Sequence, residues 1–137
     1  MFATGSGLGP YISILKTAEI WERFEKIVLV HGAPLVKELV YADLIRTWQQ
    51  NSPDQFRFIS CVTREQNPAG LHGRVTDLFA KGDLENEIGL EISKENSHLM
   101  LCGNHNMIDA MKTSLAKRGL KKHLRHKPGH ITTEEYF

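Results

Sequence analysis

The sequence predicts an α/β fold in which a doubly wound, Rossmann-like parallel sheet of about five strands carries helices on both faces. Continuous apolar runs have the composition of strands that are covered on both sides. Helical patterns separate these runs, and such alternation is typical of right-handed strand–helix–strand crossovers. The 137 residues suffice for one core, so we expect a single domain, 1–137. The strand candidates are "KIVLV" at 26–30, "FRFISCV" at 56–62 and "HLMLCG" at 98–103.

The first strand is expected to be truncated. Only Met1 and Phe2 precede "ATGSGLGP" at 3–10, a glycine-rich loop of the kind that normally follows a complete strand. A first helix is predicted to begin after Pro10, because proline is favoured at the start of a helix. Its apolar side chains recur at three-residue steps, at Ile12, Leu15, Ala18 and Trp21.

Two further helices are predicted from the spacing of apolar residues. The segment 64–97 has no clear periodicity, and we expect a polar loop followed by short helical or irregular pieces. The apolar positions are Leu44 and Trp48 in the second helix, and Ile108, Met111 and Leu115 in the third.

Composition and charge exclude several classes of function. The net charge of +1 provides no overall attraction to nucleic acid or membrane surfaces. No run approaches the roughly 20 apolar residues that a membrane helix needs, and the N-terminal residues do not resemble a signal peptide. Cys61 and Cys102 are far apart and lack Cys-x-x-Cys spacing, which argues against a zinc site or a disulfide framework. We therefore expect a cytoplasmic protein with two reduced thiols.

The glycine-rich loop is a candidate phosphate cradle. Gly5, Gly7 and Gly9 lie between a strand remnant and a helix start, where backbone without Cβ atoms lets a pyrophosphate approach the first amides of the helix. A plain tight turn has the same spacing, so both interpretations remain open on these residues alone. The second strand ends in His31 and Gly32, without the acidic residue of the common NAD fingerprint.

Five sequence blocks, taken together, are more specific than any one of them. They are "ATGSGLGPYISIL", "VLVHGAPLVKELVY", "CVTREQNPAGLHGRV", "HLMLCGNHNMI" and "KHLRHKPGHITTEEYF". In order and spacing they resemble the NADP-binding half of bacterial ferredoxin (flavodoxin) NADP reductases, from about Ala3 to the last residue. The resemblance implies a two-domain flavoprotein that passes hydride between NADPH and FAD. The FAD-binding β-barrel domain would be absent from this chain, which alone is expected to lack activity.

The resemblance also assigns cofactor-binding residues. Thr63 and Arg64 would follow the third strand, and Arg74 would return across a loop to complete a clamp for the 2′-phosphate of NADP. On the residues alone, solvated loop charges are the favoured interpretation of both arginines, and only the resemblance reverses this preference. Some relatives carry another arginine where this chain has Pro34, and Lys37 is a candidate substitute. The cradle itself would comprise Thr4, Gly5, Ser6, Gly7, Leu8, Gly9 and Pro10.

Two further groups of residues receive roles from the resemblance. Cys102, with Gly103 and Asn104 after it, would pack at the nicotinamide and help to position it for hydride transfer. A buried cysteine that packs as a small hydrophobe is the alternative. At the chain end, Tyr136 would stack on the flavin ring and Phe137, where many relatives have tryptophan, would lie toward the adenine. An incidental aromatic tail is the alternative for this pair.

A basic segment near the chain end is a candidate partner surface. Because ferredoxins and flavodoxins are acidic, a basic surface can steer them, although a solvated face has the same composition. His123, His126 and His130 lie inside this run of cations, which would repel a divalent ion, so no metal site is expected. The cations are Lys117, Arg118, Lys121, Lys122, Arg125 and Lys127.

Two alternative functions remain open for the chain. It could be the nucleotide-binding domain of another flavoprotein reductase, or a stand-alone nucleotide-binding module.

Overall fold

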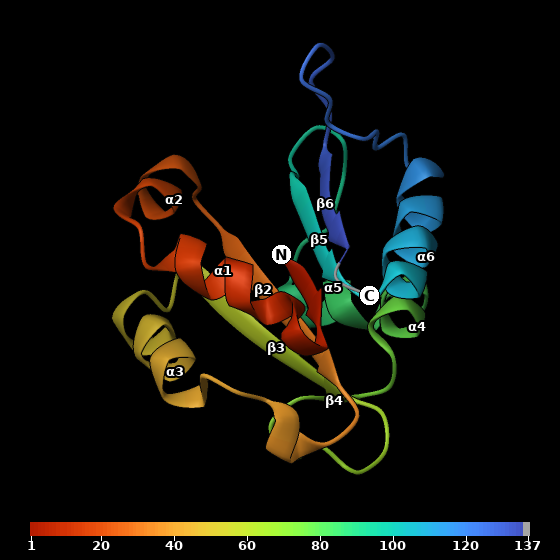
Figure 1. Cartoon of the computed structure of the whole chain (residues 1–137). Helices are drawn as coiled ribbons and strands as arrows, with labels where there is room; N and C mark the ends of the chain where they lie inside the picture. Colours follow the sequence, from red (N-terminus) through yellow and green to blue (C-terminus); the bar gives the residue numbers. More distant parts are fainter. Residues whose placement is uncertain (136–137) are drawn as a thin grey trace.

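Six parallel strands form the centre of the computed structural model, which describes residues 1–135 (Figure 1). The strand order is β4-β3-β2-β1-β5-β6, and each neighbouring pair is parallel. The predicted doubly wound α/β class is confirmed, but the sheet has six strands rather than about five. The strands are β1 (Phe2–Thr4), β2 (Ile27–Ala33), β3 (Phe56–Val62), β4 (Leu71–His72), β5 (Leu99–Gly103) and β6 (Ile131–Glu135).

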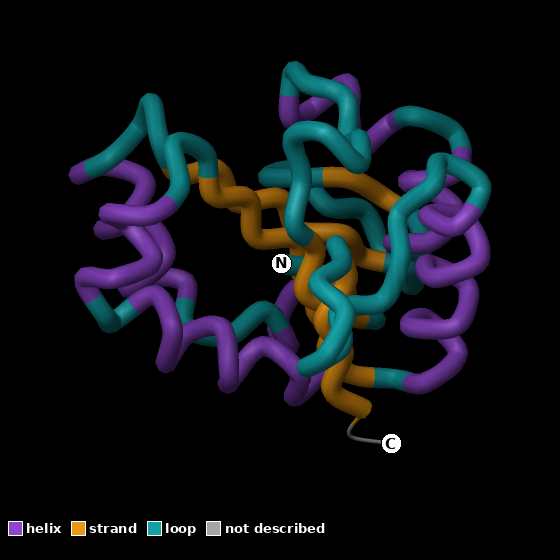
Figure 2. Tube along the Cα trace, turned by 90° about the horizontal axis from the view of Figure 1, so that it is seen from above, coloured by secondary structure: helices purple, strands orange, loops and turns teal. Residues whose placement is uncertain are grey.

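Helices cover both faces of this sheet, as predicted (Figure 2). Helices α1, α2 and α3 pack on one face, and α4, α5 and α6 on the other, so that the buried apolar side chains form two clusters. None of the helices in residues 1–135 is long and apolar enough to cross a bilayer. The helices are α1 (Leu8–Leu15), α2 (Ala18–Arg23), α3 (Ala42–Asn51), α4 (Val75–Ala80), α5 (Asp83–Ile88) and α6 (His105–Ala116), with short 3₁₀ helices η1 (Gly5–Gly7) and η2 (Val36–Glu38).

The two strands that the sequence did not reveal lie at the edges of the sheet. β4 has only two residues, too few to produce a pattern. β6 reads "ITTEE", and only Ile131 in it is buried, because an edge strand that is largely solvated needs no apolar run. β6 nevertheless pairs along its whole length with β5, from Leu99 opposite Ile131 to Gly103 opposite Glu135.

The predicted first helix is in fact two helices. α1 begins at Leu8, ahead of Pro10, and ends at Leu15. Thr17 then adopts an extended backbone (φ −92°, ψ 148°), and α2 starts at Ala18. The three-residue spacing nonetheless identified side chains of one apolar cluster, which includes Ile12, Leu15 and Trp21. Trp21 in α2 also donates a hydrogen bond from Nε1 to the carbonyl oxygen of Leu15 at 2.8 Å.

β1 is short, as predicted, yet it lies in the centre of the sheet. It has three residues against seven in β2, and it pairs with both β2 and β5. Its apolar side chains remain well covered, since Phe2 is 3% and Ala3 is 0% exposed. Because all strands are parallel, their carboxyl ends lie along one edge of the sheet, where β1 leads into η1 and α1.

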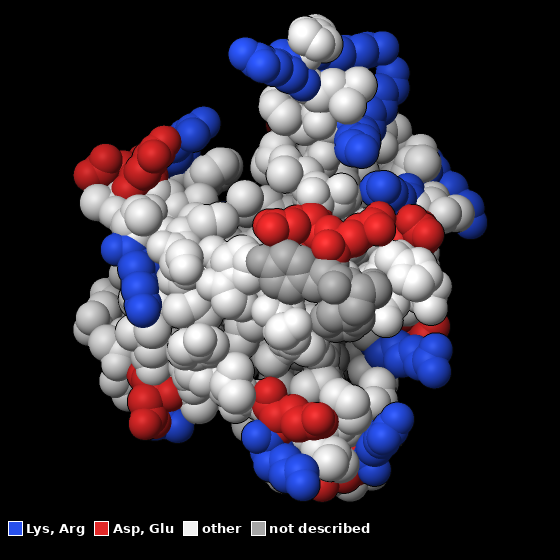
Figure 3. Space-filling model, in the orientation of Figure 1, with Lys and Arg blue, Asp and Glu red and all other residues white. Residues whose placement is uncertain are grey.

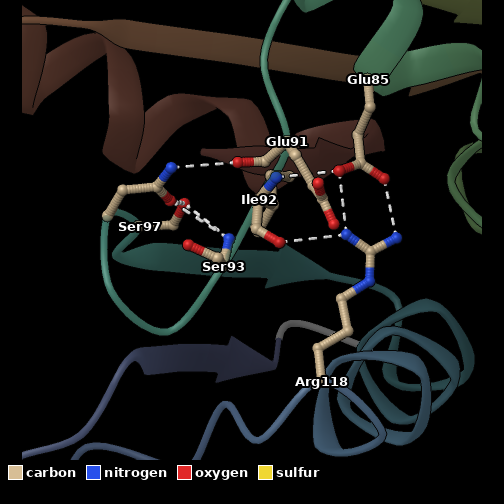
Figure 4. A network of polar contacts seen from close by, with 7 residues as sticks. Glu85, Glu91, Ile92, Ser93, Ser97 and Arg118 are labelled. Atoms are coloured by element: carbon tan, nitrogen blue, oxygen red, sulfur yellow. Dashed lines mark hydrogen bonds and ion pairs between the residues drawn. The ribbon is translucent and has the colours of Figure 1, made fainter.

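An ion pair between Arg118 and Glu85 ties the end of α6 to α5 and to the loop before β5 (Figure 4). The guanidinium donates to both carboxylate oxygens, at 2.9 and 2.7 Å, and also to the carbonyl oxygen of Ile92 at 3.1 Å. The same carboxylate accepts the Ile92 amide at 2.8 Å. Arg118 also lies 4.5 Å above the centre of the Phe79 ring. These hydrogen bonds hold the pKa of Glu85 below its ordinary value, and those from Arg118 have the largest effect.

Replacing Arg118 with methionine is expected to lower the free energy of unfolding by about 2–3 kcal/mol, because Glu85 would keep a poorly solvated charge without its partner. The matched control is Arg57→Met, which removes an ion pair to Glu87 between half-exposed side chains and should cost about 0–1 kcal/mol. Urea denaturation at pH 7 measures both variants, and equal losses would contradict the prediction. The Arg118 effect should shrink as the pH falls below about 4.5, because the depressed pKa of Glu85 stabilises the fold only while the group is ionised.

Candidate functional site

A pocket of about 680 Å³ lies at the carboxyl edge of the sheet, where the chain changes direction. From β1 the chain passes into α1 on one face, and from the neighbouring β5 it passes into α6 on the other face. Ligands of doubly wound folds bind outside such a switch point. The pocket brings together five predicted residues from four segments of the chain, namely Thr4, Gly5, Thr63, Arg74 and Asn104.

The glycine-rich loop is held against the end of β5 by a close backbone approach. A Cβ atom on Gly7 would lie 2.7 Å from the carbonyl carbon of Cys102 and 2.9 Å from Cα of Gly103. Gly5 has φ of +53°, in the left-handed region that favours glycine. Gly9 meets neither requirement, since a Cβ there has no atom within 4 Å apart from its chain neighbours. Two of the three glycines are therefore required by the local geometry.

The remaining residues of the predicted cradle form the start of the first helices. Ser6 is exposed and lies in η1 between Gly5 and Gly7. Leu8, Gly9 and Pro10 form the first turn of α1, with the Leu8 side chain buried in the core. Ser6 therefore presents its side chain to solvent, whereas Leu8 anchors the helix.

The side chain of Thr4, the last residue of β1, binds the chain just before α6. Thr4 Oγ1 accepts the backbone amide of Asn104 at 3.0 Å. Asn104 in turn caps α6, because its side-chain oxygen accepts the amide of Asn106 at 2.8 Å. Gly103 ends β5 directly beside Thr4. The amino ends of α1 and α6 are thus fixed on the two sides of the switch point.

The sequence interpretation missed His31, which lies beneath the glycine-rich loop. This residue of β2 is 0% exposed, and its Nε2 lies 3.1 Å from the carbonyl oxygen of Gly5. Nδ1 has no hydrogen-bond partner among residues 1–135. Burial lowers the pKa of His31, and the bond to Gly5 opposes this effect only in part. The signal was available in the sequence, because a histidine interrupts an otherwise apolar strand and must find a partner there.

The loop that carries the two predicted arginines folds back on itself. Asn67 is buried and donates to the Ser60 carbonyl, the Ser60 hydroxyl and the Leu71 carbonyl, at 3.2, 3.0 and 3.1 Å. After this turn, the Gly73 amide donates to the Val62 carbonyl oxygen at 2.9 Å. Arg64 lies two residues after Val62 and Arg74 directly follows Gly73, so both begin at the end of β3.

Both guanidinium groups are available to a ligand. Arg64 and Arg74 are exposed, and neither forms an ion pair with a carboxylate in the described part of the chain. Arg74 and Thr63 line the pocket, whereas Arg64 lies outside its lining. The Arg64 amide donates to the Pro34 carbonyl oxygen at 2.9 Å, which ties this loop to the end of β2. Lys37, the candidate substitute, is exposed in η2.

Nearby carboxylates are engaged by backbone amides. Glu65 accepts the Val36 amide at 2.6 Å, and Glu38 accepts the Leu35 amide at 3.0 Å. Such hydrogen bonds offset part of the negative charge that these groups place beside the arginines.

Cys102, which is predicted to position the nicotinamide, is not on the pocket surface. Cys102 is 1% exposed and packs with Ala3 and Leu8 in the cluster on the α1 face. Tyr136 and Phe137 lie outside the described residues. Cys61 is also buried, and burial raises the pKa of its thiol to about 12.

The basic segment lies at the opposite end of the sheet from the pocket. Residues 121–130 precede β6 and project beyond its start, where Lys and Arg side chains gather (Figures 1 and 3). Lys121, Lys122, Arg125 and Lys127 are exposed there. Arg118 is instead held by Glu85 and is not part of this surface. Across residues 1–135, no three His, Cys, Asp or Glu side chains are grouped so that they could hold a metal ion.

A doubly wound sheet with a glycine-rich loop at its switch point defines the class of nucleotide-binding domains with a Rossmann-like fold. The comparison with known families agrees with this class. The chain belongs to the oxidoreductase NAD-binding domain family, whose model matches residues 1–113.

Similar proteins are reductases of greater length. The flavodoxin/ferredoxin–NADP reductases of Buchnera aphidicola subsp. Schizaphis graminum and Escherichia coli K12 are each 41% identical over 138 residues, which is 100% of this chain and 54% and 56% of theirs. The crystal structure of a ferredoxin NADP+ reductase from Neisseria gonorrhoeae with bound FAD and NADP matches with a TM-score of 0.92 at 32% identity, covering 100% of this chain and 55% of that one. The resemblance inferred from the five sequence blocks is confirmed, and the chain spans about half the length of these relatives.

Exchanging Gly7 for alanine is expected to lower the free energy of unfolding by about 2–3 kcal/mol, because the new methyl group would collide with the backbone of β5. Gly9→Ala is the matched control and should stay within about 1 kcal/mol of the parent, since the gain in helix propensity offsets the strain before Pro10. Thermal and urea denaturation of both variants provide the measurement. A Gly7 variant as stable as the Gly9 variant would refute the close contact between the loop and β5.

Proposed function

We propose that residues 1–137 are the NADP-binding domain of an FAD-dependent reductase that exchanges electrons between NADPH and ferredoxin or flavodoxin in the cytoplasm. The observation that carries this proposal is the packing of the Gly5–Gly7 loop against the end of β5 at the switch point of the sheet. The names of the relatives support it, since those of similar sequence are flavodoxin or ferredoxin NADP reductases.

The cradle fits the phosphate groups of a dinucleotide. Gly5 places no Cβ atom between the loop and a ligand, Gly7 lets the loop pack on the backbone of β5, and the loop leads directly into α1. Helix N-termini attract anions through their free amides and their dipoles. The pocket volume of about 680 Å³ is within the range of about 300–1,000 Å³ that is usual for small-molecule sites.

The arginines supply the proposed preference for NADP over NAD. Arg64 and Arg74 start from the same end of β3, and neither forms an ion pair with a carboxylate among residues 1–135. A charged hydrogen bond from a guanidinium to a phosphate is worth roughly 1.5–3 kcal/mol. Two such groups would grip the 2′-phosphate, which NAD lacks, with Thr63 beside them.

The chemistry would take place at the end of β5. When bound, NADPH supplies a hydride and FAD accepts it. We propose that Cys102, Gly103 and Asn104 position the nicotinamide, and that Tyr136 and Phe137 lie against the FAD. Cys102 would act through packing and not as a nucleophile, because its buried thiol lies in an apolar cluster.

The specificity of the site can be tested with 2′-phospho-AMP and AMP, followed by calorimetry or amide NMR shifts. We expect binding of the 2′-phosphate compound to be about tenfold tighter or more, to weaken with salt, and to lose this advantage in Arg64→Ala or Arg74→Ala. Arg125→Ala, at the other end of the sheet, is the control for loss of one positive charge. Equal affinity for the two ligands would refute the clamp, and binding of neither would refute the nucleotide site.

The basic segment is proposed to dock ferredoxin or flavodoxin through its exposed cations. At low salt, an acidic ferredoxin should shift amide signals of residues 121–130, and Lys121→Glu with Lys122→Glu should weaken binding about tenfold or more. Lys16→Glu with Lys81→Glu changes the net charge equally at exposed sites elsewhere. If both pairs weaken binding equally, the attraction is non-specific and the proposed docking surface is wrong.

A further inference from the structure

His31 occupies a position where an apolar residue would avoid a desolvation cost. It lies toward the carboxyl end of β2, opposite Ala3 of β1, and is wholly buried. Only one of its two ring nitrogens has a hydrogen-bond partner among the described residues. Burying the other nitrogen without a partner is unfavourable, so the bond that is made must account for the histidine.

The partner of His31 determines which nitrogen carries the proton. The carbonyl oxygen of Gly5 can only accept, so Nε2 must donate and Nδ1 must be the bare nitrogen. The lowered pKa agrees with this neutral form, because burial disfavours the imidazolium. His31 therefore contributes a directed hydrogen bond at neutral pH and no charge.

This hydrogen bond sets the orientation of one peptide group in the cradle. In a trans peptide, the carbonyl of one residue and the N–H of the next point in opposite directions. The Gly5 carbonyl points toward His31, so the Ser6 amide points away from it. Glycine tolerates both orientations of the following peptide, because it lacks the Cβ atom that restricts other residues. Without a donor beneath it, the Gly5–Ser6 peptide would be free to turn over.

We propose that His31 is a positioning residue that holds the Gly5–Ser6 peptide with its carbonyl buried and its amide directed to the pyrophosphate of the nucleotide. A reversed peptide would present a carbonyl oxygen to the phosphate and repel it. The inference rests on the proposed nucleotide-binding function and adds a specific role within it. His31 governs the pyrophosphate end of the ligand, whereas Arg64 and Arg74 govern the 2′-phosphate end.

Two ligands allow the contacts to the pyrophosphate and to the 2′-phosphate to be tested separately. Adenosine 2′-monophosphate has the 2′-phosphate but no pyrophosphate, whereas 2′-phospho-ADP-ribose has both. In the full chain, His31→Leu should weaken binding of 2′-phospho-ADP-ribose about tenfold or more and leave binding of adenosine 2′-monophosphate within about twofold, as measured by calorimetry and NMR titration. Arg64→Ala should instead weaken both ligands. His31→Gln should restore most of the affinity, because its side-chain amide can donate to the Gly5 carbonyl.

The outcomes distinguish this inference from the function on which it rests. If the parent chain binds neither ligand, the proposed function fails. If it binds both and His31→Leu leaves both affinities unchanged, or weakens both equally, the positioning role is refuted. ¹⁵N NMR of the parent ring provides a test that does not need a stable variant: a proton on Nε2 is expected, and a proton on Nδ1 alone would overturn the inference.

Discussion

Contact between the glycine-rich loop after β1 and the end of β5 is the constraint on which the site depends. Gly7 lies on the backbone of Cys102 and Gly103, and Thr4 accepts the Asn104 amide. These contacts join the segments that lead to α1 and α6, so both helix starts are held at the same edge of the sheet. The central strand β1 can be as short as three residues, because β2 and β5 pair with it on either side and Thr4 at its end accepts the Asn104 amide. The conformation of the glycine-rich loop thus depends on tertiary contacts as well as on its own sequence.

Two cationic features of the chain are separated by the length of the sheet. Arg64 and Arg74 lie at the carboxyl edge, whereas residues 121–130 precede β6 at the amino edge. The five residues of β6 alone span about 16 Å, which exceeds the Debye length of about 8 Å at physiological salt. The field of one feature is therefore largely screened at the other. Nucleotide recognition and partner docking would accordingly make independent electrostatic contributions.

The fold and several of the residues that line the pocket were predictable because their signals are local. The sequences of strands β2, β3 and β5 are mostly apolar, and the loop at 3–10 has recognisable glycine spacing. β6 was not predictable from periodicity, since "ITTEE" has no apolar pattern and forms a strand through its pairing with β5. The break at Thr17 was hidden because α1 and α2 contribute side chains to the same cluster. The His31 contact with Gly5 joins residues 26 positions apart, which no local pattern reports.

In the proposed site, backbone groups and side chains would contact different parts of the nucleotide. Gly5 and Gly7 shape the backbone surface that is proposed to accept the pyrophosphate, and this surface is held by contacts with β5 and His31. Arg64 and Arg74 lie instead on an exposed loop, whose course is set by Asn67 and whose side chains are free to change partner. Substitutions in that loop could therefore alter the choice between NADP and NAD without disturbing the cradle. In the proposed site, affinity for the part that NAD and NADP share and selectivity for the 2′-phosphate would therefore rest on separate residues.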